Sequence, residues 1–280
     1  MNGSRASNQT FPYHFHATIA GQCDRPTLVL LHGFMGNGEN FREAIAALGD
    51  RFRTIAVDLP GHGQTRVFGG RRHYTIAETA RGLVTWLDRL HIQRCFLYGY
   101  SMGGRLALYL AVHYPDRFPK VVLESASPGL KTAAERSRRR QRDRALAAQL
   151  ETVELTSFLT DWYRQPLFAS LRSHPDFPRL LAARSRNLPA ELATCLRYMG
   201  TGNQPSLWPH LANCGASLLL LVGECDDKFV AINREMARSC PVARLAIVPN
   251  AGHTVHFENL RDWTTAVVRF LSPEVDALPI

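Results

Sequence analysis

The sequence predicts an α/β protein, with a mostly parallel central sheet, helices on both of its faces and an inserted helical cap. Two observations carry this prediction. Short apolar runs rich in β-branched residues alternate with amphipathic helical patterns along much of the 280-residue chain, as in sheets built from strand–helix–strand units. The alternation stops between about residues 127 and 213, where no buried strand is evident and helical patterns, prolines and arginines dominate.

The predicted elements follow one another in order. Residues 13–20 alternate with period two, which fits an antiparallel edge strand. We predict buried strands at residues 27–31, 54–57, 95–98, 120–124, 217–222 and 245–248, and helices at residues 40–48, 76–90, 102–114, 233–239 and about 257–271. The chain therefore divides into a first core segment (1–126), a cap (127–213) and a second core segment (214–280). Because ligands of open α/β sheets bind beyond the C-terminal strand ends, the cap is expected to roof the site.

Composition narrows the class of protein. Apolar residues make up 45% of the chain, which is enough for a packed core. No apolar run approaches the roughly 20 residues of a membrane span, and residues 1–10 lack the apolar segment of a signal peptide, so we expect a cytoplasmic protein. The six cysteines show no paired or metal-binding spacing, which predicts reduced thiols, no disulfide and no metal site.

The formal net charge of +9 leaves three interpretations open: solubility, an anionic substrate, or a nucleic-acid or membrane surface. No nucleic-acid module or basic amphipathic anchor accompanies the charge, so we expect neither nucleic acid nor membrane as a partner. Arginine outnumbers lysine, and its density peaks at residues 136–144. Guanidinium groups bind carboxylates through two parallel hydrogen bonds, which favours an anionic small molecule.

The most informative motif is Gly99-Tyr100-Ser101-Met102-Gly103-Gly104. It follows an apolar run and precedes a helical pattern, the context in which a G-x-S-x-G serine stands exposed on a tight turn. Glycines are required on both sides because a Cβ atom would clash with the neighbouring strand and helix. Ser101 is therefore the predicted catalytic serine, and the Met102 N–H is predicted to face developing negative charge.

An acid and a histidine complete the predicted catalytic set. A serine hydroxyl needs a histidine base, and that histidine needs a carboxylate on its other ring nitrogen. Asp226 and His253 each follow a predicted strand, in the chain order serine, acid, histidine that this topology uses. Asp226 is preferred to its neighbour Asp227, and His253 to His256, which lies at the start of the last helix.

Two further loops follow early strands. The loop His32-Gly33-Phe34-Met35-Gly36 occupies the place from which lipases and esterases supply an oxyanion-hole N–H, so the Phe34 N–H is the predicted partner of Met102. His32 is interpreted as a structural brace of that loop. The tight turn at residues 58–63 is also assigned a structural role, since an acid there would need a different chain order.

Together, HGF at 32–34, DLPGHG at 58–63, GYSMGG at 99–104 and AGH at 251–253 resemble the motifs of the α/β hydrolase fold family. Finer features resemble one family of that fold, the 2-succinyl-6-hydroxy-2,4-cyclohexadiene-1-carboxylate synthases of menaquinone and phylloquinone biosynthesis. These features are Arg105, SPGL at 127–130, DWYRQPLFASL at 161–171, AARS at 182–185 and DKF at 227–229. The run at 161–171 is the most specific, because a generic esterase has no reason to share it.

The resemblance implies a lyase that eliminates pyruvate from 2-succinyl-5-enolpyruvyl-6-hydroxy-3-cyclohexene-1-carboxylate without metal or cofactor. In this use Ser101, deprotonated through His253, is the base that removes a ring proton. The substrate carries three carboxylates, and the resemblance implies that substrate contacts come from Tyr100, Arg105, Arg139, Trp162, Arg184 and Lys228. Arg138, Arg140 and Arg142 are expected to face solvent instead, because one helix presents its residues in several directions.

Two other functions remain open on the sequence. A serine C–C or ester hydrolase of the same fold would use Ser101 covalently or to activate water, since fold alone does not set the reaction. A protein that only binds a ligand would not need the ordered serine, acid and histidine. We expect a monomer or weak oligomer, and the sequence does not distinguish menaquinone from phylloquinone as the end product.

Overall fold

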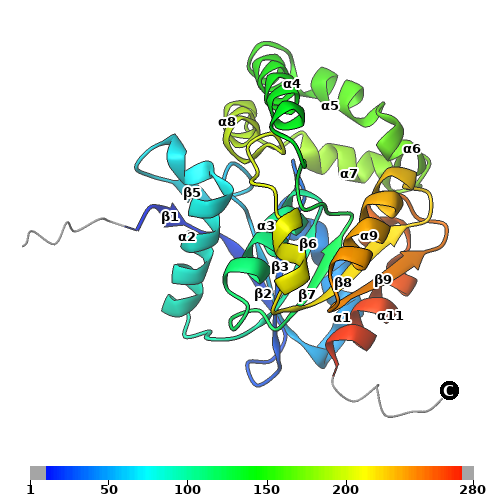
Figure 1. Ribbon diagram of the computed structural model, residues 1–280. Coiled ribbons are helices and arrows are strands. Elements are labelled where there is room, and N and C mark those ends of the chain that lie inside the picture. The colour runs from blue at the N-terminus through cyan, green and yellow to red at the C-terminus, as the bar shows by residue number, and fades with distance from the viewer. Residues whose placement is uncertain (1–10, 273–280) are drawn as a thin grey trace, which may run out of the picture.

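Within residues 11–272, the part of the chain that the computed structural model describes, a seven-stranded sheet forms the centre of the molecule (Figure 1). Its spatial order is β2 (Ala17–Ala20), β4 (Arg53–Val57), β3 (Thr27–Leu31), β6 (Phe96–Tyr100), β7 (Lys120–Glu124), β8 (Ser217–Gly223) and β9 (Ala243–Val248). β2 pairs antiparallel with β4, and the other neighbouring pairs are parallel. The predicted mostly parallel sheet is confirmed.

Alternate residues of the strands build a core on each face of the sheet. In β3, Val29 and Leu31 join the core beneath α2 (Ile76–Arg89), α3 (Met102–His113) and α9 (Asp227–Ser239). Leu28 and Leu30 join the opposite core, with α1 (Arg42–Leu48) and α11 (Leu260–Leu271). Both faces are thus covered, which is why these strands are nearly continuous apolar runs.

Between β7 and β8 the chain forms helices with a core of their own. They are α4 (Ala133–Thr152), α5 (Leu155–Tyr163), η4 (Pro166–Phe168), α6 (Ala169–Arg172), α7 (Phe177–Arg184), α8 (Pro189–Met199) and η5 (Trp208–Asn213). Figure 1 shows α4, α5, α7 and α8 together at the top of the view, with the sheet below them. Thr132 and Glu135 form a capping box that starts α4.

Several boundaries differ from the prediction. Residues 13–20 are not one strand: β1 (Tyr13–His14) pairs with β5 (Arg66–Val67) outside the main sheet, and only β2 forms the antiparallel edge. α9 begins at Asp227, six residues earlier than predicted, because the Asp226 side chain caps it. The last predicted helix is divided into α10 (Val255–Glu258) and α11, since Asn259 ends one and caps the other.

Two kinds of feature are absent from the same part of the chain. No helix in residues 11–272 has the length and apolar character needed to cross a bilayer. Over the same residues, no three or more histidine, cysteine or acidic side chains are grouped so that they could hold a metal ion. The signal-peptide prediction falls on residues 1–10, which lie outside the described residues.

Candidate active site

Ser101 stands on a strained turn between β6 and α3. Its φ of 51° and ψ of −105° lie where an L-residue rarely rests. Glycine is needed beside it, because a Cβ on Gly99 would lie 2.4 Å from the Gly103 carbonyl oxygen, and one on Gly103 would lie 2.2 Å from that of Leu31. The Ser101 N–H donates to the Glu124 carbonyl at 2.8 Å, which ties the turn to β7.

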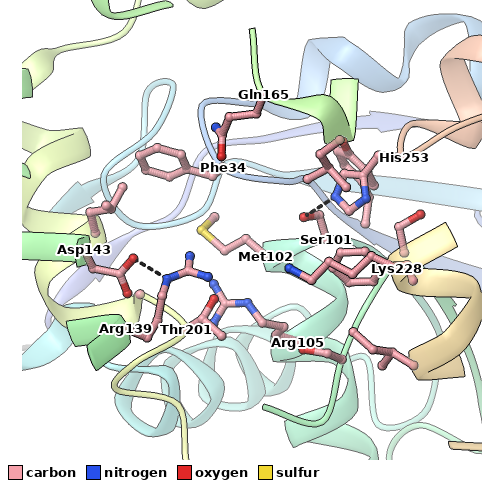
Figure 2. A pocket seen from close by; sticks show the side chains of 18 of the residues that line it. Phe34, Ser101, Met102, Arg105, Arg139, Asp143, Gln165, Thr201, Lys228 and His253 are labelled. Carbon is pink, nitrogen blue, oxygen red and sulfur yellow. Dashed lines mark hydrogen bonds and ion pairs between the residues drawn. The ribbon is translucent and has the colours of Figure 1, made fainter. Parts of the chain in front are cut away.

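The serine, histidine and acid predicted from the sequence meet at the ends of their strands. Ser101 Oγ lies 3.0 Å from His253 Nε2, and His253 Nδ1 lies 2.7 Å from Asp226 Oδ2 (Figure 2 draws the serine–histidine bond). The His253 and Asp226 side chains are both buried. Asp227 is exposed and stays outside this chain of hydrogen bonds. The geometry suits proton transfer from the hydroxyl to the imidazole.

A carboxylate that the sequence reasoning missed holds the histidine loop. Glu258 accepts the backbone N–H groups of Gly252 and Thr254, each at 2.9 Å, on either side of His253. The rejected candidate His256 instead pairs with the buried Glu124 at 2.8 Å. An acid five residues after a loop histidine was the available signal for Glu258.

The loop that carries Phe34 is held by two buried histidines. His62 Nε2 accepts the Met35 N–H at 3.0 Å, and His32 Nε2 accepts the Leu59 N–H at 2.9 Å. Burial lowers the pKa of His62 to about 4 and that of His32 well below its usual range, so both rings are neutral acceptors at pH 7. No hydrogen bond among residues 11–272 uses the N–H of Phe34 or Met102, which leaves both donors available.

A cavity of about 460 Å³ adjoins the serine and histidine. Apolar side chains, including Phe34, Trp162 and Phe168, form part of its wall, and Trp162 packs on Phe34 at 5.4 Å between ring centroids. Cationic side chains also line it: Lys131, Arg105, Arg139, Arg142, Arg184 and Lys228. Figure 2 shows Arg105, Arg139 and Lys228 on the side of Ser101 opposite Gln165.

The predicted cations differ in their partners. Arg139 donates from Nε to the buried Asp143 at 2.7 Å, an i,i+4 ion pair within α4. Arg184 is buried, donates from Nη1 to Asn40 Oδ1 at 2.9 Å, and leaves its buried Nε unpaired. Burial, and then the nearby Arg139, lower the pKa of Lys228.

Tyr100 lies in the cavity wall next to Ser101 and His253. Its hydroxyl shares a hydrogen bond of 2.8 Å with Thr254 Oγ1, and its ring lies 5.6 Å from that of His253. Burial raises the pKa of this phenol well above its ordinary value, so it remains protonated at neutral pH. Tyr100 therefore supplies an uncharged wall rather than a second base.

Of the three arginines expected to face solvent, Arg138 and Arg142 are exposed and Arg140 is not. Arg140 is half-buried and donates to the Gly202 carbonyl at 3.1 Å. Arg142 lines the cavity and donates to Gln165 Oε1 at 3.1 Å. The physical reason for the position of Arg140 is that α4 packs against α8, which brings this side of α4 against the segment that follows α8.

Comparison with known proteins agrees with this architecture. A model of the α/β hydrolase fold matches residues 26–260. The 2-succinyl-6-hydroxy-2,4-cyclohexadiene-1-carboxylate synthase of Serratia proteamaculans is 36% identical over 254 residues, which cover 90% of this chain and 95% of that protein. A Bacillus subtilis protein that provisionally carries the same name is 41% identical over 247 residues, 88% of this chain and 90% of its own. The solved structure of MenH from S. aureus has a TM-score of 0.85 and 33% identity, and covers 94% of this chain and 98% of that one.

The fold and the matched family model thus define an α/β hydrolase fold protein. The identity to full-length relatives narrows the assignment within that fold. The chain belongs to the family of 2-succinyl-6-hydroxy-2,4-cyclohexadiene-1-carboxylate synthases, which are lyases.

Proposed function

We propose that this chain eliminates pyruvate from 2-succinyl-5-enolpyruvyl-6-hydroxy-3-cyclohexene-1-carboxylate, giving 2-succinyl-6-hydroxy-2,4-cyclohexadiene-1-carboxylate. The names of its relatives support the reaction. One observation carries the proposal on chemical grounds: Ser101 and His253 share their cavity with several cationic side chains. A substrate with three carboxylates needs such partners next to the reacting groups.

In this reaction Ser101 acts as a base rather than as an acylated nucleophile. His253 accepts the hydroxyl proton across the 3.0 Å bond, and Asp226 orients the ring and stabilises its positive form. The serine oxygen removes the ring proton next to the succinyl ketone. The C–H electron pair forms a double bond between C2 and C3, the existing double bond moves from C3–C4 to C4–C5, and the C5–O bond to the enolpyruvyl group breaks. The released enolate takes up a proton to become pyruvate. The reaction consumes no water.

The N–H groups of Phe34 and Met102 are proposed to stabilise the negative charge that develops on the ketone oxygen, or to bind a carboxyl group. Both are free of intramolecular acceptors in the described part of the chain. Met102 begins α3, so its N–H also lies at the positive end of a helix dipole. Donors placed in advance at such a position lower the barrier without reorganising during the reaction.

Carboxylate recognition is proposed to come from both parts of the protein. Arg139 and Arg184 belong to the cap, which we place at residues 127–213, whereas Arg105 and Lys228 belong to the α/β core. Trp162 adds an apolar contact from the cap side. A substrate bound in this cavity would therefore link the cap to the core through ion pairs.

We further propose a cytoplasmic monomer or weak oligomer whose substrate is a small anionic tricarboxylate, with no nucleic-acid or membrane partner. The six cysteines are all free thiols, which supports a reducing compartment. The cationic side chains that line the cavity account for part of the positive charge without a nucleic-acid surface.

A coupled assay tests the reaction. Lactate dehydrogenase reports pyruvate released from the enolpyruvyl substrate by the wild-type chain and by Ser101→Ala. Pyruvate release well above that of the Ser101→Ala control is expected, and equal rates would overturn the proposal. Turnover of p-nitrophenyl esters measures the alternative: rapid ester hydrolysis without pyruvate release would make the chain a serine hydrolase.

A further inference from the structure

Arg105 is one of the cavity arginines whose side-chain hydrogen bonds go to neutral acceptors alone, as do those of Arg184 and Arg142. Its Nη1 donates to the Met199 carbonyl at 3.0 Å and to Gln204 Oε1 at 3.2 Å. In residues 11–272 it forms no ion pair, whereas Arg139 is paired with Asp143. Arg105 is half-buried, and a guanidinium taken out of water ordinarily has a carboxylate partner.

Gln204 is itself almost fully buried, with 1% of its surface exposed, and its amide is oriented from both ends. Its Nε2 donates to the Ser127 carbonyl at 3.3 Å, so its oxygen is the end that faces Arg105. A Cβ on Gly129 would lie 3.2 Å from the same nitrogen, which shows how closely the backbone packs against this amide. The side chain therefore has little freedom to turn its oxygen away from the arginine.

Both hydrogen bonds of Arg105 involve the same nitrogen of its guanidinium group. Both neutral acceptors bond to Nη1, and no hydrogen bond in the described part of the chain uses Nε or Nη2. Nε and Nη2 form the edge of a guanidinium that binds a carboxylate through two parallel bonds. An amide oxygen fixes the group without cancelling its charge, whereas a carboxylate at the same place would neutralise it.

We propose that Gln204 is a positioning residue for substrate recognition: its neutral amide holds Arg105 so that a fully charged guanidinium edge faces a substrate carboxylate. The proposal rests on the proposed function for the identity of the substrate. The amide must accept a hydrogen bond and must carry no negative charge.

Two substitutions at this position separate charge from structure. Gln204→Met removes the acceptor but leaves Arg105 charged, and is expected to raise KM about tenfold. Gln204→Glu keeps both the shape and the acceptor but neutralises the arginine, and is expected to raise KM about 100-fold, with kcat changed less than KM. A purely structural role predicts the reverse order, since the glutamate preserves the bond to Arg105 and the methionine does not.

Asn203→Asp is the matched control. Asn203 is the exposed neighbour, and its side-chain amide also donates to a backbone carbonyl, that of Arg197 at 2.5 Å. The substitution introduces the same charge and removes the same kind of donor away from the cavity. KM within about twofold of the wild-type value is expected, because exposed charges interact weakly.

Binding is measured separately from turnover, with propane-1,2,3-tricarboxylate as the probe in isothermal titration calorimetry, and thermal unfolding verifies that each variant is folded. The Kd of the probe should follow the order wild type, Gln204→Met, Gln204→Glu. If the wild-type chain releases no pyruvate but the Kd values keep this order, the proposed reaction fails and the role of Gln204 stands. If Gln204→Glu binds the probe as tightly as Gln204→Met or better, the role is overturned. If Gln204→Glu does not fold, unchanged KM and Kd in Gln204→Met overturn it.

Discussion

Replacing Asp226 by asparagine tests the proposed catalytic set most directly, because the change removes charge and little else. The Asp226 carboxylate lies 2.7 Å from His253 Nδ1, and both side chains are buried. It also caps α9 by accepting the Phe229 N–H at 3.2 Å. Asparagine is as good an N-cap as aspartate, so the helix and the fold should be retained.

The size of the effect follows from the separation of the two groups. A carboxylate and an imidazolium at 2.7 Å attract each other by about 6 kcal/mol at an effective dielectric constant of about 20. The amide oxygen of Asp226→Asn can still accept from Nδ1, so we expect roughly half of this to be lost. About 3 kcal/mol corresponds to a decrease in kcat of about 100-fold.

The assay is pyruvate release at saturating substrate, with thermal unfolding as the measure of the fold. Asp227→Asn makes the same chemical change one residue further on, at an exposed side chain, and should leave kcat within about twofold. Asp226→Asn with more than half of the wild-type kcat would refute the role given to this carboxylate. Equal losses in both variants would refute the distinction between Asp226 and Asp227.

Three further predictions concern binding and stability. Arg184→Lys replaces the guanidinium group that bonds Asn40 with a single ammonium group. In the pyruvate assay KM should therefore rise about tenfold, with kcat changed less. An unchanged KM would exclude Arg184 from substrate recognition. Burial lowers the pKa of His62 from 6.5 to about 4 in the folded protein. The folded state thus favours the neutral ring, so its stabilising effect is complete above about pH 6.5 and declines as the pH falls toward 4. Urea titration should show about 2 kcal/mol lost between pH 7.5 and pH 5, and a constant free energy of unfolding would contradict this. Thr132→Ala removes the capping box with Glu135 and should lower the free energy of unfolding by about 1 kcal/mol, measured in the same titration; no loss would show that α4 does not depend on its cap.

The sheet was predictable because its strands are buried on both faces. For β3 and β7, the bounds predicted from the apolar runs are the bounds observed in the structure. The edge was harder to predict: residues 13–20 keep one alternating pattern, yet pairing with β5 draws residues 13–14 out of the main sheet. That pairing depends on where a distant loop returns, which no local pattern records.

The proposed catalytic residues were predictable and the surroundings of the arginines were not. Ser101, Asp226 and His253 each follow a strand with a recognisable local signal, and parallel strands bring their C-terminal ends to one edge. The position of Arg140 depends on how α4 packs against α8. A 20-residue helix with little amphipathic pattern does not reveal which side will be covered.

The charge of the cavity explains how a serine, histidine and acid typical of hydrolases could serve an elimination. Arg105, Arg184 and Lys228 form no ion pair with a carboxylate among the described residues, and the ion pair of Asp143 is with Arg139. A neutral ester that enters this space would displace the water bound to those cations. Because the ester would not replace the hydrogen bonds that this water makes, its binding would cost free energy. A tricarboxylate would supply carboxylate partners for these cations. Binding affinity would therefore favour a tricarboxylate over a neutral ester before any covalent bond changes. Once such a substrate is bound, its enolpyruvyl ether offers a leaving group that departs when a proton is removed. The same base that would activate a hydroxyl for ester attack is then sufficient for loss of pyruvate.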